Sequence, residues 1–416
     1  MTSPIDPSTP GAGARDAELA SLRARLAAAE TAFLVDLKHL VGIDSGSWSP
    51  AGVDAVGAWV AGFLRDLGAG VATHPDPDGK LGATVVGVVA GKQGGPRGLL
   101  IGHLDTVFPD GTAAERPFRV AGGRATGPGV TDDKGGLLAG LYALRALVAR
   151  GLLPFERLVV VANPDEEIGS PASTPLIRAL AAESDVAFVL ECGRANGDIV
   201  SSRKGSLDLE LVIHGRAAHA GVEPEKGRSA IVEAAHQVIG IHRLNGRWLG
   251  VTANAGVVEG GTRPNVVAER ARLEVDLRAL DRTGLELAEA ALRQLAAAPA
   301  VPDVRVEVLE RARHWPMEKL PRSARLVDHA RALARRIGFE VADAATGGAS
   351  DANTTAGLGV PTLDGLGPIG GDDHSPSEYL EVASVVPRTV LLAGLLLAVG
   401  RDPVVAGWRW DRGASA

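Results

Sequence analysis

The sequence predicts an α/β protein in which a mostly parallel sheet, covered by helices in a three-layer arrangement, carries an inserted ferredoxin-like α+β domain. Continuously apolar runs such as LLIGH, LVVVAN and VAFVLE are typical of strands buried on both faces. These runs alternate along the chain with helical patterns, as in α/β folds. From Gly205 the segment GSLDLELVIHG instead alternates apolar and polar residues, which indicates a strand with one buried face.

The first part of the chain supplies most of the expected sheet. Residues 1–14 are rich in Pro, Ser, Thr and Gly and are expected to be disordered. A helical period follows over residues 16–41, and a second helix is expected over residues 52–67. Strands are then expected at residues 83–89, 98–103, 157–163 and 186–191, with helices near residues 134–150 and 172–182.

The inserted domain is expected to occupy residues 205–313. It begins with the alternating strand and continues with a helix at 228–244, strands at 251–258 and 268–280, a helix at 284–298 and a strand at 304–310. The order β-α-β-β-α-β is the split-βαβ pattern. Helical patterns return near 323–337, 350–357 and 383–399, so residues 15–204 and 314–416 are expected to form one discontinuous catalytic domain.

Composition excludes several classes of protein. Hydrophobic residues make up 45% of the chain and charged residues 22%, which is ordinary for a globular protein. Because the net charge is −7 and the sequence has no long basic run, we do not expect the protein to bind nucleic acid. The most apolar stretch, residues 390–399, is too short to span a bilayer, and the N-terminus lacks a signal-peptide pattern. We therefore expect no membrane association and a cytoplasmic location.

The single cysteine, Cys192, excludes an internal disulfide and any multi-cysteine metal site. It is expected to be a small buried residue. A cysteine hydrolase would need a paired histidine and a poised turn, and nothing local to Cys192 supplies either. The glycine-rich segments contain neither GxxxxGK[ST] nor a strand–GxGxxG–helix, so a nucleotide enzyme is also poorly supported.

Four segments concentrate histidine and carboxylate residues at strand ends and in loops. They are IGHLDTVFP, with His103 and Asp105; GPGVTDDKGG, with Asp132 and Asp133; NPDEEIGS and VLECG, with Glu166, Glu167 and Glu191; and GGDDHSPSEYL, with His374. Loops beyond the carboxyl ends of parallel strands form the ligand crevice of such sheets. Two histidines and several carboxylates suit a divalent metal, zinc first, and one aspartate between two ions would use the carboxylates economically.

Each segment also has a simpler interpretation. A histidine after a strand is more often a surface or core residue, and DEE after a strand commonly begins a helix, where the dipole favours acidic side chains. The glycines around Asp132 could form ordinary turns. The four segments together, in this order, are far less expected by chance.

The order of these segments resembles the zinc aminoacylase/carboxypeptidase-G-type metallopeptidase family, which includes glutamate carboxypeptidase, acetylornithine deacetylase and succinyl-diaminopimelate desuccinylase. The family pattern is H-x-D, G-x-G-x-x-D-x-K-G, D-E-E, a carboxylate after the next strand, and a late histidine. The matching residues are His103-Leu104-Asp105, residues 127–135, Asp165-Glu166-Glu167, Glu191 and His374.

The resemblance implies a role for each matching residue. His103 and Glu191 would bind one zinc ion, Glu167 and His374 would bind a second, and Asp132 would bridge the two ions. Glu166 would be the general base and acid, and Asp105 would orient His103. The resemblance further implies two Zn²⁺ per chain, with Co²⁺ or Mn²⁺ as alternatives, and a cis peptide bond after Asp132.

The inserted domain resembles the lid and dimerisation domain of the same family. The segment GRAAHAG then makes His219 a candidate oxyanion donor that acts on the partner subunit, and the protein a homodimer. Candidate substrate-binding residues are Asn265, Arg278, Arg313 and Gly348. Arginine offers bidentate geometry for a substrate carboxylate, although Arg278 and Arg313 could equally form structural ion pairs.

These observations predict a dinuclear zinc hydrolase that cleaves an amide or peptide bond beside a free carboxylate, on a dipeptide, an N-acyl amino acid or a C-terminal glutamyl compound. An acetylornithine-type deacetylase is the alternative within the family. A non-catalytic metal or amino-acid binding protein is the alternative from another class. Arg203 and Lys204 replace small polar residues of glutamate-releasing relatives, which weakens the case for a C-terminal glutamate.

Overall fold

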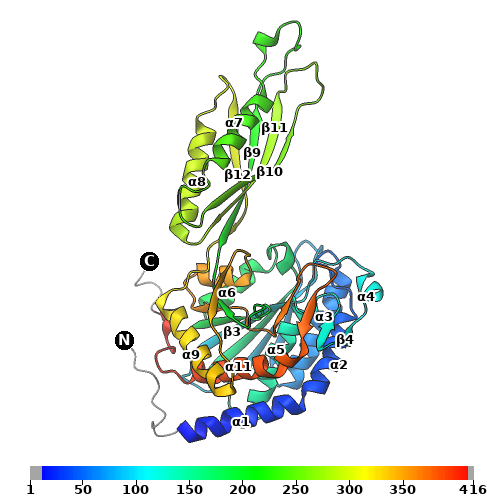
Figure 1. Ribbon diagram of the computed structural model, residues 1–416, viewed down its shortest axis with the longest axis vertical. Coiled ribbons are helices and arrows are strands. Elements are labelled where there is room, and N and C mark those ends of the chain that lie inside the picture. Colours follow the sequence, from blue (N-terminus) through cyan, green and yellow to red (C-terminus); the bar gives the residue numbers. More distant parts are fainter. Residues whose placement is uncertain (1–11, 411–416) are drawn as a thin grey trace. The chain divides into compact units, whose positions relative to one another are not determined.

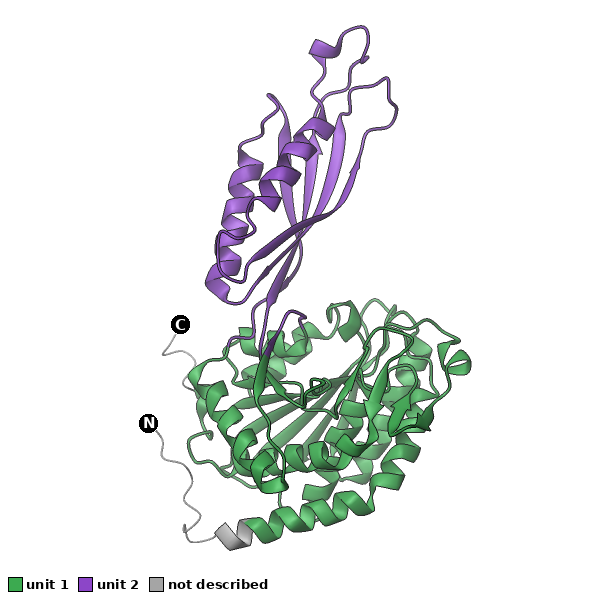
Figure 2. Cartoon of the chain, viewed as in Figure 1, with its two compact units in different colours: residues 1–201, 319–344, 350–416 green, residues 202–318, 345–349 purple. Residues whose placement is uncertain are grey.

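The computed structural model of the protein describes residues 12–410 and divides into two compact units (Figure 2). Unit 1 contains the chain up to Ser201, together with Lys319–Ala344 and Ser350–Ala416, and unit 2 contains Ser202–Glu318 and Ala345–Ala349. Most of the segment predicted to be disordered, residues 1–14, lies outside the described residues. Residues 12–14 instead begin the first helix, α1 (Ala12–Ala28).

The central sheet of unit 1 is mixed. Its six strands lie in the order β1-β2-β6-β3-β7-β14. Parallel pairing joins β6, β3, β7 and β14, as predicted, whereas β2 and β1 are added antiparallel at one edge. The strands are β1 (Gly70–His74), β2 (Thr84–Ala90), β3 (Arg97–His103), β6 (Arg157–Asn163), β7 (Val186–Val189) and β14 (Thr362–Leu363).

Four of these strands coincide with the predicted apolar runs, and β1 and β14 do not. β1 is mostly exposed and therefore lacks a continuous apolar run. Within β3, the neighbouring residues Leu99 and Leu100 are both fully buried, and so are Val159 and Val160 of β6, at 0–1% exposure. Because successive side chains of a strand point to opposite faces, both faces of the sheet are covered.

Helices of unit 1 supply that cover. Helix α1 lies along α11, and α11 contacts α5 and α9 (Figure 1). The predicted helical stretch 16–41 is two helices, separated at Ala29. The remaining helices of this unit are α2 (Glu30–Val41), α3 (Pro50–Asp66), α4 (Thr112–Glu115), α5 (Lys134–Val148), α6 (Thr174–Ala182), α9 (Pro321–Ile337), α10 (Asp351–Gly357) and α11 (Val382–Gly400).

Helix α11 is 19 residues long with a mean hydropathy of 2.1, so by length and composition it could cross a membrane. The predicted apolar run, residues 390–399, forms the second half of this helix. However, 72% of the 18-residue segment with this hydropathy is buried inside the protein, as in a core helix. The helix also carries a buried arginine, Arg388, which donates hydrogen bonds to the backbone carbonyls of Gly197, Gly365 and Gly367.

Unit 2 follows the order β-α-β-β-α-β, and its four antiparallel strands lie in the order β10-β11-β9-β12. Leu207, Leu209 and Leu211 of β9 pack into a core with the two helices. On the opposite face, Glu210 pairs with Arg311. The elements are β9 (Gly205–His214), α7 (Ala230–His242), β10 (Thr252–Gly260), β11 (Arg270–Ala279), α8 (Arg282–Ala297) and β12 (Arg305–His314).

Short elements complete the chain. A second small sheet of unit 1 has the order β15-β16-β5-β4, and β13 pairs with β8. These strands are β4 (Arg119–Ala121), β5 (Arg124–Thr126), β8 (Ile199–Arg203), β13 (Asp343–Thr346), β15 (Gly370–Gly371) and β16 (Tyr379–Glu381). Two 3₁₀ helices, η1 (Glu166–Ile168) and η2 (Pro224–Lys226), lie in loops.

Candidate metal centre

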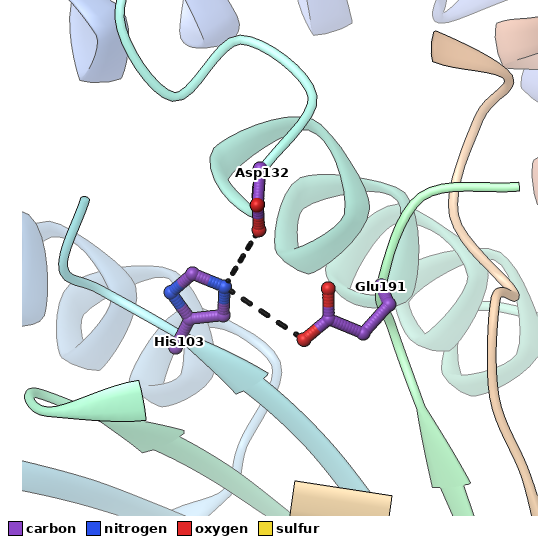
Figure 3. Close-up of side chains that lie close together, drawn as sticks. All are labelled: His103, Asp132 and Glu191. Carbon is purple, nitrogen blue, oxygen red and sulfur yellow. Dashed lines mark hydrogen bonds and ion pairs between the residues drawn. The ribbon is translucent and has the colours of Figure 1, made fainter. Parts of the chain in front are cut away.

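His103 is the last residue of β3 and is almost fully buried. Its Nε2 atom lies 3.0 Å from Oδ1 of Asp132 and 3.9 Å from Oε1 of Glu191 (Figure 3). Its Nδ1 atom lies 3.0 Å from the backbone oxygen of Asp105 and 3.3 Å from the Oδ1 atom of that residue. The expected contact between His103 and Asp105 is therefore present, through both backbone and side chain.

A second group of possible ligands shares Asp132 with the first. The Oδ2 atom of Asp132 lies 3.1 Å from Nε2 of His374. The same nitrogen lies 3.0 Å from Oε2 of Glu167. In each group of three residues, the atoms that could bind a metal ion lie within 4.8 Å of one another. All five residues named as ligands from the sequence thus converge.

The fold explains this convergence. His103 ends β3, Glu166 and Glu167 follow β6, and Glu191 follows β7, so neighbouring parallel strands deliver all four at their carboxyl ends. Asp132 comes from the loop before α5, and its peptide bond to Asp133 is cis, as the resemblance implies.

His374 lies in the loop between β15 and β16 with a φ of 61°, in the left-handed region. Histidine adopts this conformation several-fold more often than most residues. In the loop that carries Asp132, Gly129 also adopts the left-handed backbone conformation, with a φ of 72°. A Cβ atom there would lie 2.6 Å from Thr106, so only glycine fits.

Asp105 has a second role that the sequence did not predict. Its carboxylate is fully buried and accepts a hydrogen bond from Ser47 Oγ at 2.7 Å. It also accepts hydrogen bonds from the backbone N–H groups of Glu166 and Glu167, each at 3.1 Å. Asp105 therefore holds the backbone of both glutamates as well as the ring of His103.

Burial and neighbouring charges perturb the ionisation of the centre. Burial opposes the charge of Asp132, but hydrogen bonds with His103 and His374 outweigh it and hold the Asp132 pKa well below its usual range. Hydrogen bonds with Asp132 and Glu167 raise the pKa of His374 to about 10. Burial, and then the charge of Glu191, raise the pKa of Glu166 well above its usual range.

These shifts reflect a cluster that has more carboxylates than histidines. Burial also opposes the charge of His103, but hydrogen bonds with Asp105 and Asp132 outweigh it and raise the pKa of His103 well above its usual range. A divalent cation would satisfy the same carboxylates, and a histidine binds metal in its neutral form. The donor set, two imidazoles and three carboxylates divided around a shared aspartate, suits ions such as zinc.

Three residues beside the centre make contacts that the sequence did not predict. Asp133 is buried, and its Oδ2 atom accepts the backbone N–H of His103 at 3.2 Å. Lys134 is buried and donates to the backbone oxygen of Ile43 at 2.8 Å. Glu378 is buried behind the Asp132 loop. The only available signals were the D-x-K-G spacing and a carboxylate four residues after His374.

The candidate residues of the inserted domain lie in unit 2. His219 is exposed, and its Nδ1 atom accepts the backbone N–H of Gly221 at 3.1 Å. The backbone oxygen of the exposed Asn265 accepts the N–H of Ala220 at 3.0 Å, so the His219 and Asn265 loops lie side by side.

The predicted arginines already have partners. Arg313 pairs with Glu289 at 2.8 Å and with Glu310 at 2.7 Å, which is the structural alternative considered for it. Arg278 pairs with Asp276 at 3.1 Å and donates to the backbone oxygen of Gly347. The carbonyl of the next glycine, Gly348, accepts a hydrogen bond from Arg203 at 3.0 Å. The two glycines are thus held through their carbonyl groups.

Cys192 is buried and free, as expected. Its Sγ atom lies 3.8 Å from Asp373 and 3.7 Å from Arg194. Burial raises the pKa of the thiol well above its usual range, which disfavours a nucleophilic thiolate.

Comparison with known proteins agrees with this geometry. The chain is 30% identical over 374 residues to carboxypeptidase G2 from Pseudomonas sp. (strain RS-16), covering 89% of this chain and 90% of that protein. It is 28% identical over 236 residues to acetylornithine deacetylase from Klebsiella pneumoniae (strain 342), covering 53% and 60%.

Among solved structures, aminopeptidase PepT from Bacillus cereus ATCC 10987 matches with a TM-score of 0.73 and 25% identity, over 90% of this chain and 98% of that chain. Human carnosine dipeptidase 1 shares the fold, with a TM-score of 0.66 and 17% identity over 92% and 100% of the two chains. The model of Peptidase family M20/M25/M40 matches residues 99–398. The chain belongs to this family and is a hydrolase that acts on amide bonds.

Proposed function

We propose that the protein is a dinuclear zinc hydrolase that cleaves an amide or peptide bond beside a free carboxylate. The observation that carries this proposal is that two groups of metal-binding side chains share one aspartate, Asp132. In this proposal His103 and Glu191 complete the first site, and Glu167 and His374 complete the second. Two sites that share a carboxylate would suit the pair of ions that two-metal hydrolases use.

Glu166 performs the proton transfers in this mechanism. It takes a proton from the attacking water and later delivers it to the leaving amine, which cannot depart as an anion. Asp105 holds the base in place because it accepts the backbone N–H of Glu166. When bound, two zinc ions would supply Lewis acidity that polarises the substrate carbonyl and lowers the pKa of the water.

The relatives support a substrate class for this proposal. One relative that covers most of this chain is named a carboxypeptidase, and that name implies a free carboxylate beside the cleaved bond. Dipeptides and N-acyl amino acids are therefore the proposed substrates. The similarity to acetylornithine deacetylase supports the second candidate, removal of an acyl group from an N-acylated amino acid.

A metal analysis paired with a substrate screen tests this proposal. We expect about two zinc ions per chain, and release of an amino acid from N-acyl amino acids or dipeptides that a chelator abolishes and added Zn²⁺ restores. Co²⁺ and Mn²⁺ are added in parallel to identify the working metal. A protein that binds no metal after reconstitution and turns over none of these compounds would instead be a binding protein on the same scaffold.

We further propose that unit 2 is a lid that dimerises with a second copy of the chain. Strand β10 is an edge strand, and an edge offers unpaired backbone groups to a partner. Ile231 and Ile239 of α7, two helical turns apart, are 46% and 51% exposed, and Val258 of β10 is 56% exposed. An isologous contact would bury this apolar surface on both copies.

Substitution of His219 by alanine tests whether this residue acts across the dimer. We expect turnover to fall roughly 100- to 1000-fold, the loss typical of one oxyanion donor. Mixing the variant with an Asp132→Ala subunit is expected to restore activity, because one subunit supplies the metal centre and the other supplies His219. A monomeric protein by light scattering, or mixed subunits without recovery, would contradict the proposal.

A further inference from the structure

Glu378 is a buried carboxylate without a role in the proposed chemistry. It is 1% exposed and lies between β15 and β16, four residues after His374. Its Oε2 atom accepts the backbone N–H of Gly129 at 2.8 Å, and its Oε1 atom accepts those of Thr131 at 2.9 Å and Asp132 at 3.1 Å. One side chain thus accepts hydrogen bonds from three backbone N–H groups of the same loop, the last of which belongs to the shared aspartate.

This arrangement joins two loops that are distant in the chain. Asp132 and His374 are separated by 242 positions, yet they contact one another at the centre. Glu378 closes the turn that directly follows His374, because its N–H donates to the carbonyl of Ser375 at 3.2 Å, and the Ser375 N–H in turn donates to the carbonyl of Asp372 at 3.1 Å across His374. The carboxylate therefore connects the loop that carries His374 to the backbone of Asp132.

Loss of the hydrogen bonds between the Glu378 carboxylate and the Asp132 loop is expected to cost free energy. A buried carboxylate needs several hydrogen bonds to offset its lost hydration, and charge-assisted bonds are roughly twice as strong as neutral ones. The nearby ammonium of Lys134 adds a favourable charge. Without Glu378, three backbone N–H groups at the base of the metal centre would lose their acceptor.

Resting on the proposed dinuclear function, we infer that Glu378 is a positioning residue that sets the spacing of Asp132 and His374 and so controls affinity at the second metal site. The first site is less dependent on it, because His103 and Glu191 are placed by β3 and β7. A change at Glu378 should therefore weaken binding of the second ion more than binding of the first.

The test compares Glu378→Gln with Glu381→Gln. Glutamine keeps the shape of the side chain but turns one acceptor into a donor that faces a backbone N–H group. Glu381 lies three residues further along and forms a partly exposed ion pair with Arg124, so it is a matched control. Zn²⁺ binding is titrated in buffered chelator, and Co²⁺ absorption spectra are recorded for each ion added.

We expect Glu378→Gln to bind the first ion within about threefold of the wild-type affinity and the second at least tenfold more weakly, since 1.4 kcal/mol corresponds to a factor of ten. The Co²⁺ spectrum of the second site should change, and Glu381→Gln should match the wild type. Glu378→Asp, which keeps the charge but shortens the side chain, should show a smaller loss in the same step.

Two results would overturn the inference. One is wild-type affinity in both steps, in Glu378→Gln and in Glu378→Asp. The other is an equal loss in both steps accompanied by a lower melting temperature of the metal-free protein, which would indicate a general structural role. A wild-type protein that binds fewer than two ions would contradict the dinuclear proposal itself, so the two failures are distinguishable.

Discussion

Replacing Glu166 by glutamine is expected to lower kcat by roughly 100- to 10,000-fold, the usual contribution of a general base and acid, while the protein retains both metal ions. Glu166 belongs to neither group of possible metal ligands. Glutamine has nearly the same shape but cannot accept and return a proton. Metal content and initial rates on the best substrate, measured on the same preparation, test this prediction.

Glu183→Gln is a suitable control for this experiment. Glu183 forms a surface ion pair with Arg157, so its loss should leave both metal content and turnover near wild type. Near-normal activity in Glu166→Gln would show that another group carries the proton. Loss of metal together with activity would show instead that Glu166 acts as a ligand.

Replacing Asp132 by alanine is expected to have the largest effect on metal binding. Its two carboxylate oxygens lie 3.0 Å and 3.1 Å from the imidazoles of His103 and His374, so a single change removes a ligand from both groups. We expect fewer than two ions per chain after dialysis and turnover below detection. Metal analysis by mass spectrometry, with activity assayed under saturating Zn²⁺, measures both effects.

Asp78→Ala serves as the control, because the Asp78 side chain is 75% exposed and pairs only weakly with Lys80 at 3.8 Å. The assignment of Asp132 as the shared ligand would be wrong if Asp132→Ala bound two ions with wild-type affinity. Retention of one tightly bound ion would show that one group remains competent without the bridge, and the position of that ion could be identified from its Co²⁺ spectrum.

Much of the candidate centre could be predicted from the sequence because its ligands follow local patterns. His103 ends an apolar strand run, Glu167 and Glu191 follow two others within a few residues, and parallel strands present their carboxyl ends at one edge. The glycines around Asp132 and the order of the four segments added the rest. Each of these patterns spans only a few residues, so it can be recognised in the sequence before the fold is known.

Other features depend on contacts between distant segments. The edge strand β1 has no continuous apolar run, because most of its residues are exposed. Arg313 was equally compatible with a substrate carboxylate or an ion pair, and the fold places Glu289 and Glu310 beside it. A guanidinium carries the same charge in either setting, so only its neighbours distinguish the two.

The sequence by itself thus determined the family, the main strands of the sheet and the side chains that converge at the candidate metal centre. The tertiary structure alone decided how those side chains are held: Asp105 accepts the N–H groups of the two glutamates, and Glu378 accepts those of the Asp132 loop. Backbone N–H groups are the same in nearly every residue, so no sequence pattern records which carboxylate accepts them.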